Sequence, residues 1–168
     1  LQSFIFMPVF GLNNGMVPII SYNYGAKKPD RLWKTVKLST IVAVAIMTIG
    51  LIAFETIPGP LLSLFNADAE MLDIGSKALR IIAIHFPLAG FCIIAGSVFQ
   101  AVGNPPHSVI TSVCRQMVVI LPAAYLLGKL GGLDAVWFAF PIAELVSLTL
   151  STIFMVQTVR LVRAKIAG

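Results

Sequence analysis

Long apolar runs are the feature that most restricts how this chain folds. A helix needs about 20 residues to cross a hydrocarbon core about 30 Å thick, and runs of that length are separated here by short or polar connections. They lie at about residues 1–24, 36–57, 79–102, 108–128 and 135–159. The predicted fold is therefore an all-α integral membrane bundle of five transmembrane helices, with no appended soluble domain.

The composition agrees with lipid as the solvent of this chain. Of its 168 residues, 58% are hydrophobic and 11% are charged, which is more apolar surface than a single soluble core can bury. Its 12 Lys and Arg outnumber 7 Asp and Glu, a balance that in a soluble domain would suggest nucleic acid binding. Because the basic residues lie between apolar runs, we expect a lipid bilayer as the partner and no nucleic acid.

Basic residues gather in alternate connections. The first connection and the tail hold Lys27, Lys28, Arg31, Lys34, Lys37, Arg160, Arg163 and Lys165. The second connection instead carries Asp68, Glu70 and Asp73 beside Lys77 and Arg80. The positive-inside rule therefore predicts a multi-pass plasma membrane protein, in a bacterial inner membrane, with a cytoplasmic carboxyl terminus. Since the chain opens directly in an apolar run at Leu1, we expect it to be a piece of a longer protein.

Proline recurs inside the predicted spans, where it removes a backbone hydrogen bond and bends the helix. In lipid, the freed carbonyls must be met by neighbouring helices, hydroxyl groups or cavity water. Proline is commoner in membrane helices than in soluble ones, which is enough to explain any single case. The whole set favours helices that line a cavity or move; it comprises Pro8, Pro18, Pro87, Pro122 and Pro141.

Polar residues within the first span are candidates for lining a substrate cavity. Asn13 and Asn14 are adjacent, and consecutive residues lie about 100° apart on a helix, so both cannot face the same neighbour. At least one of them should reach a polar cavity or another helix; the alternative is a purely structural hydrogen bond between helices. Tyr22, toward the cytoplasmic end, and Gln100, near the end of the third span, are further candidates.

Once positions near the span ends are excluded, three ionisable residues lie inside predicted spans: His85, Arg115 and Glu144. Glu144 is close to the predicted midplane, where a carboxylate is costly and marks a functional site. We expect Glu144, with Arg115, to be the coupling-ion site; the alternative is an ion pair of structural value only. His85 is interpreted as a hydrogen-bonded packing residue. The sequence shows no catalytic set, phosphate loop or metal-ligand spacing, so no enzyme, cofactor or metal is predicted.

Several motifs resemble the MATE (multidrug and toxic compound extrusion) family. The segment MPVFGLNNGMVPIISYNYGAKKPDR is similar to the one that opens the second half of these exporters, and FQAVG, Arg115 with Gln116, and GGLDAVWFAFPIAE agree with later parts. The resemblance covers the whole chain in order. It implies a twelve-helix transporter of two lobes, in which residues 1–168 would form part of the carboxyl-terminal lobe, as helices 8 to 12, with an amino-terminal lobe of the same protein as partner.

The resemblance also implies a function: secondary active export of lipophilic, often cationic, small-molecule drugs in exchange for sodium ions or protons by alternating access. Some members carry a coupling aspartate in the helix that corresponds to residues 79–102, but Ile81 to Val102 contains no acid. Glu144 is then the candidate substitute, or coupling depends on the other lobe.

Two other functions compete with drug export. A lipid-linked sugar flippase of related fold would line its cavity with several cationic side chains, whereas Arg115 is the only one expected to be buried within a span. A non-transporting membrane scaffold belongs to a different class, and proline-broken spans that carry asparagine argue against it.

The charge asymmetry generates a test of topology. Single cysteines introduced at Lys28 and Asp68 should react with an impermeant thiol reagent from opposite sides of the membrane, since the positive-inside rule places the two connections on opposite faces. Labelling of both positions from the same side would contradict the predicted orientation.

Overall fold

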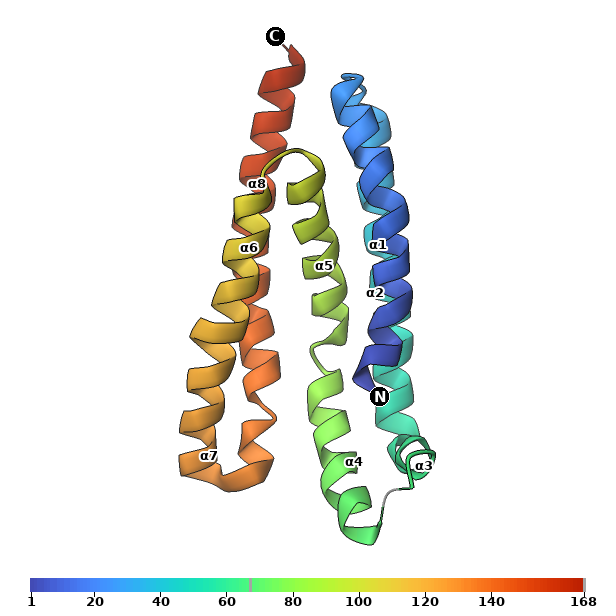
Figure 1. Cartoon of the computed structure of the whole chain (residues 1–168), viewed down its shortest axis with the longest axis vertical. Helices are drawn as coiled ribbons and strands as arrows, with labels where there is room; N and C mark the ends of the chain where they lie inside the picture. The colour runs from blue at the N-terminus through green and yellow to red at the C-terminus, as the bar shows by residue number, and fades with distance from the viewer. Residues whose placement is uncertain (67, 168) are drawn as a thin grey trace.

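A computed structural model describes residues 1–66 and 68–167, and in these ranges the chain is helical without any β-strand. The chain runs up and down along one long axis, and both α4 with α5 and α6 with α7 form bent arms (Figure 1). The elements are α1 (Gln2–Gly25), α2 (Pro29–Thr56), α3 (Pro58–Ser63), α4 (Ala69–Ala83), α5 (Phe86–Ala101), α6 (Pro105–Val113), the π-helix η1 (Cys114–Ile120), α7 (Leu121–Val136) and α8 (Ala139–Ala167).

The helices have the length and apolar character that a membrane bundle needs. Four stretches are long and apolar enough to cross a bilayer: Gln2–Gly25, Pro29–Thr56, Pro105–Val136 and Ala139–Lys165. The pair α4 and α5 passes the same test only as one span bent by 52°. The all-α membrane architecture predicted from the apolar runs is confirmed.

The bent pair of α4 and α5 differs in detail from the predicted span at residues 79–102. A break at Ile84 and His85 divides that span between α4 and α5, and helix already begins at Ala69, ahead of the predicted span. Asp68 explains the early start, because its carboxylate accepts a hydrogen bond from the Met71 amide at 2.8 Å and caps the helix. Pro29 similarly starts α2 ahead of the predicted boundary, since proline suits the first helical turn.

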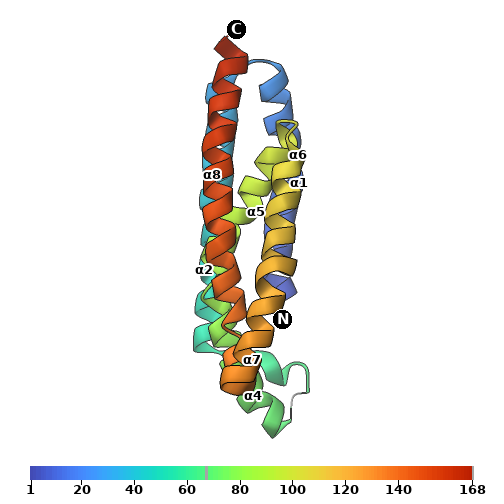
Figure 2. The ribbon, with the colours of Figure 1, turned by 90° about the vertical axis from the view of Figure 1, so that its left-hand side faces the viewer.

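Helix α5 is the central element of the bundle. It packs against α1, α2, α6 and α8, and its Phe86 ring meets Phe6 of α1 edge-on at 5.5 Å and Phe54 of α2 at 5.3 Å between ring centroids. Figure 2 shows α8 running nearly the full length of the molecule beside the arm formed by α6 and α7. The bundle thus has a wall of α1 and α2 and a second wall of α6 to α8, joined by α5.

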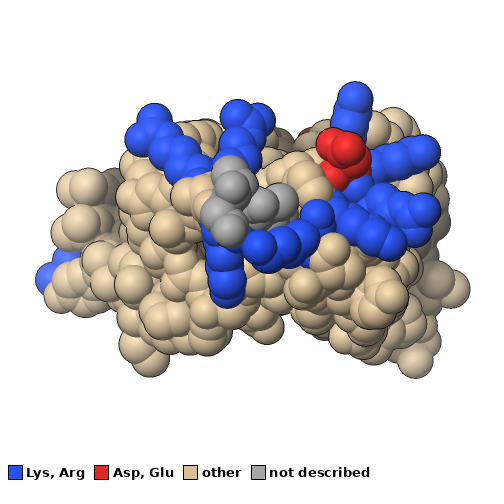
Figure 3. Space-filling model, turned by 90° about the horizontal axis from the view of Figure 1, so that it is seen from above, with Lys and Arg blue, Asp and Glu red and all other residues tan. Residues whose placement is uncertain are grey.

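One end of the bundle is strongly basic. The turn from α1 to α2, the turn from α5 to α6 and the end of α8 lie together at the top of Figure 1, and lysine and arginine side chains cover much of this end (Figure 3). This clustering brings together the two basic segments that are farthest apart in the sequence.

Close packing of α5 on α2 generates a stability prediction at Gly90. A Cβ atom there would lie 3.2 Å from the backbone carbonyl of Ala43 and 3.2 Å from the Met47 side chain. We expect Gly90→Val to force the helices apart and to cost about 1–3 kcal/mol. Gly25→Val is the control, because a Cβ at Gly25 meets nothing within 4 Å. Thermal unfolding of the protein in detergent measures both; equal midpoints would contradict the packing.

Candidate functional site

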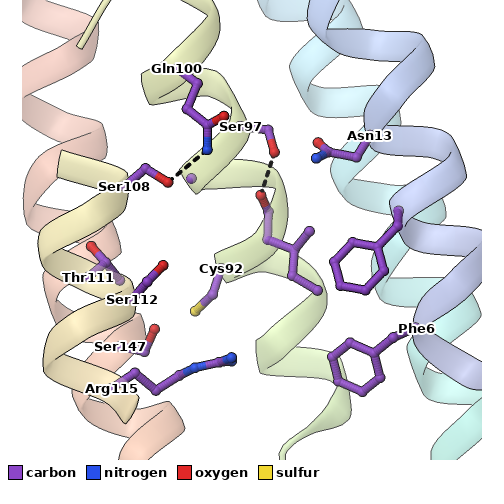
Figure 4. Close-up of a pocket in the computed structure, with 13 residues that line it drawn as sticks. Phe6, Asn13, Cys92, Ser97, Gln100, Ser108, Thr111, Ser112, Arg115 and Ser147 are labelled. Carbon is purple, nitrogen blue, oxygen red and sulfur yellow. Dashed lines mark hydrogen bonds between the residues drawn. The ribbon is translucent and has the colours of Figure 1, made fainter. Parts of the chain in front are cut away.

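A cavity of about 260 Å³ opens between α1 and α6 and is backed by α5 and α8 (Figure 4). We call it the hydroxyl cavity, because serine and threonine side chains supply much of its lining. Its residues are Phe6, Phe10, Asn13, Cys92, Ile93, Gly96, Ser97, Gln100, Ser108, Thr111, Ser112, Arg115 and Ser147. It therefore combines two phenyl rings from α1 with hydrogen-bonding groups from the other helices.

The hydroxyl cavity has both satisfied and unsatisfied polar groups. The Gln100 side-chain amide donates a hydrogen bond to Ser108 Oγ at 2.9 Å, which ties α5 to α6 (Figure 4). Asn13 Oδ1 is buried and has no hydrogen-bond partner among the described residues. Such an acceptor is costly unless water or a ligand meets it, so the cavity is suited to a guest that carries a hydrogen-bond donor beside an aromatic body.

An ion pair closes the lower end of the hydroxyl cavity. Arg115 Nη1 of η1 donates to Glu144 Oε2 of α8 at 3.1 Å. The Glu144 side chain is 2% exposed and that of Arg115 is 34% exposed, so the carboxylate depends on the guanidinium far more than the reverse. Glu144 Oε1 has no hydrogen-bond partner among the described residues. One oxygen of a buried carboxylate is thus left available.

A second, smaller cavity lies on the other side of this pair. We call it the histidine cavity; it has a volume of about 120 Å³ and is lined by Gln2, Phe6, His85, Arg115, Gln116, Ile120, Phe140 and Glu144. Arg115 and Phe6 line both cavities. A change in the charge of Glu144 would therefore be felt in the hydroxyl cavity through Arg115.

The structure brings some of the predicted site residues together and leaves others apart. Asn13, Gln100 and Arg115 line the hydroxyl cavity, and Glu144 pairs with Arg115 behind it. Asn14 and Tyr22 are exposed, and neither lines these two cavities.

The hydroxyl side chains of α6 were missed by sequence reasoning. Ser108, Thr111, Ser112 and Arg115 follow the three-to-four-residue spacing of one helix face, a signal that would have placed them together.

Three of the predicted helix-bending prolines follow irregularities in the backbone. Pro87 comes just after the break between α4 and α5, Pro122 just after η1, and Pro141 just after the turn that precedes α8. Helix α1 instead continues without interruption through Pro8 and Pro18. The breaks are thus on the three arms that surround the histidine cavity.

Comparison with protein families and curated proteins identifies relatives of this chain. A family model described as MatE matches residues 1–126. The multidrug export protein MepA of Staphylococcus haemolyticus is 30% identical over 157 residues, which cover 90% of this chain and 33% of that protein. A FAD transporter of Shewanella oneidensis is 28% identical over 145 residues, which cover 86% of this chain and 32% of that protein. The chain therefore spans about a third of the length of these relatives.

Solved structures have the same fold. The MATE multidrug transporter DinF-BH, solved as a complex, superposes with a TM-score of 0.85 at 35% identity, over 93% of this chain and 35% of that one. The Vibrio cholerae MATE transporter VcmN in its bent form superposes with a TM-score of 0.87 over 97% of this chain and 38% of that one. At 18% identity the second likeness concerns the fold alone.

The unequal burial of the ion pair predicts unequal costs of breaking it. Arg115→Met should cost about 3–5 kcal/mol, because it leaves a buried carboxylate unpaired. Glu144→Gln should cost only about 1 kcal/mol, since cavity water can reach the Arg115 guanidinium, whose side chain is 34% exposed. The double variant should regain most of the loss.

Thermal unfolding in detergent measures these costs as a double-mutant cycle. Asp73→Asn, which breaks the exposed pair with Lys77 at 3.0 Å, is the control and should change stability little. Additive losses at Arg115 and Glu144 would contradict the coupling of the pair.

Proposed function

The chain belongs to the MATE family, and we propose that it forms part of the carboxyl-terminal lobe of a secondary active multidrug exporter. In this proposal it supplies helices 8 to 12 of twelve and works with an amino-terminal lobe of the same protein. Export of lipophilic or cationic small molecules is exchanged for sodium ions or protons by alternating access. The basic end shown in Figure 3 faces the cytoplasm of a bacterial inner membrane, with the carboxyl terminus on that side.

The observation that supports this proposal most strongly is that Arg115 lines both the hydroxyl cavity and the histidine cavity. The hydroxyl cavity offers aromatic rings and acceptors to a drug, and the histidine cavity is lined by Glu144, whose Oε1 has no hydrogen-bond partner among the described residues. Arg115 borders both. The site therefore has a place for a substrate, a place for a coupling cation and a single charged side chain that borders both.

Electrostatics gives the two places opposite preferences. While Glu144 is ionised, it neutralises Arg115, and a cationic drug can occupy the hydroxyl cavity. When a proton or sodium ion neutralises Glu144, the charge of Arg115 is left uncompensated beside that cavity and repels the drug. Because the drug and the coupling cation favour different charge states of one pair, they exclude each other, as exchange requires.

The competing functions fit this site less well. A lipid-linked sugar flippase needs several cations for its headgroup, whereas Arg115 is the only charged side chain among the described residues that line the hydroxyl cavity. An anion such as the dinucleotide for which the Shewanella relative is named would need a free Arg115, but Glu144 holds it at 3.1 Å. A scaffold has no use for an unsatisfied carboxylate oxygen, which is costly when buried.

The coupling role of Glu144 can be tested in the complete transporter reconstituted in vesicles. Glu144→Gln should fold and still bind ethidium, yet lose ion-driven export by about tenfold or more, because a neutral amide neither takes up a proton nor offsets the charge of a sodium ion. Glu55→Gln is the control, since it neutralises an exposed carboxylate of α2 outside both cavities.

Dye efflux under separate sodium and proton gradients provides the measurement. A Glu144→Gln transporter that exports at the wild-type rate under both gradients would refute the coupling role. A wild-type transporter that exports no dye under either gradient would refute drug export itself.

A further inference from the structure

Two buried polar atoms in the histidine cavity have no protein partner. His85 is 3% exposed and Glu144 is 1% exposed, and both line this cavity. His85 Nδ1 and Glu144 Oε1 are fully buried and make no hydrogen bond to any described residue. Because an unsatisfied buried polar group costs free energy, two of them on residues that line one cavity point to a small polar occupant.

Water fits the size and the lining of this cavity. A water molecule takes up about 30 Å³ in the liquid and needs two to four polar partners, and the cavity measures about 120 Å³. Besides His85 and Glu144, its lining includes the side-chain amides of Gln2 and Gln116 and the guanidinium of Arg115. A short chain of water molecules can therefore link the histidine and the carboxylate, which line the same cavity.

The surroundings of His85 hold its ring in place without using that nitrogen. Phe86 meets the imidazole edge-on at 5.3 Å, and Phe140 of α8 stacks near it at 6.2 Å and 20°. The charged groups that line the cavity with His85 are Arg115 from η1 and Glu144 from α8, while α1 contributes the uncharged Gln2 and Phe6. The ring is thus fixed by aromatic packing, and the histidine lines the same cavity as the carboxylate.

We propose that the histidine cavity is a hydrated proton site in which His85 delivers the coupling proton to Glu144. This proposal rests on the exchange mechanism above and narrows its coupling ion to the proton. His85 takes up a proton on one ring nitrogen and releases one from the other to cavity water, which passes a proton to Glu144 Oε1. One proton enters and one carboxylate is neutralised, while His85 and the water return to their neutral forms.

The break between α4 and α5 places His85 where such a relay is needed. His85 immediately precedes α5, and its amide bonds the Ile82 carbonyl at 3.3 Å. Of the two cavities, only the histidine cavity is lined by His85 and Glu144, and the two share only Phe6 and Arg115. Proton delivery and drug binding therefore use different cavities that meet at Arg115.

His85→Asn and His85→Gln in the complete transporter test the relay. Both amides can satisfy a hydrogen bond to cavity water but cannot accept and release a proton, so we expect proton-driven ethidium export to fall by about tenfold or more. Ethidium binding should stay within about twofold of wild type. His107→Asn is the matched control, because this second histidine stacks on Phe154 and lines neither cavity.

The measurements are dye efflux and proton uptake, the latter from a pH-sensitive dye trapped in the vesicles. Loss of both in the two His85 variants, with binding kept and with the dependence of the rate on pH flattened, supports the relay. Wild-type rates in either His85 variant, or loss of ethidium binding together with transport, would overturn it in favour of a packing role.

The relay and the exporter can fail separately. Wild-type export that is driven by sodium without proton uptake would overturn the relay and leave the exporter standing. Absence of wild-type export under any gradient would overturn both.

Discussion

The shortage of hydrogen-bond partners in hydrocarbon is the constraint on which the rest of this structure depends. Backbone groups released by a helix break must be met inside the protein, yet the three arms formed by α4–α5, by α6–η1–α7 and by α8 are irregular near Pro87, Pro122 and Pro141. Each of these irregular points contributes a residue to the lining of the histidine cavity: His85, Ile120 and Phe140. Pro122 also accounts for the π-helix η1. Because proline has no amide N–H to donate, carbonyl groups that precede it accept hydrogen bonds from residues farther along the chain than in an α-helix.

The Arg115–Glu144 ion pair lies where the hydroxyl cavity and the histidine cavity meet. Each ion alone would be expensive at this depth, and together they are tolerated because the guanidinium meets the carboxylate at 3.1 Å. The contact joins η1 to α8, two elements that are each next to a break. A change of charge at Glu144 therefore acts on η1 and the start of α8, next to the points where the helical hydrogen bonding is interrupted.

The sequence predicted those features that depend on the hydrophobicity of a segment and on the position of a residue along a span. Apolar length predicted the membrane bundle, and the positions of Arg115 and Glu144 along neighbouring spans made their pairing an explicit alternative. The break at Ile84 and His85 could not be read, since the apolar run continues across it. The unpaired nitrogen of His85 was also out of reach, because it depends on which way the ring turns between Phe86 and Phe140.

The proposed exchange needs no long pathway between distant sites. In the ionised state of Glu144, the pair is neutral and a drug cation adds one charge to the interior; in the neutral state, Arg115 already supplies that charge. Holding both cations at once would place two positive charges within a poorly screened region, which is strongly unfavourable. Exclusion therefore follows from the sharing of Arg115 by two cavities, and the conformational change has only to decide which of them is open.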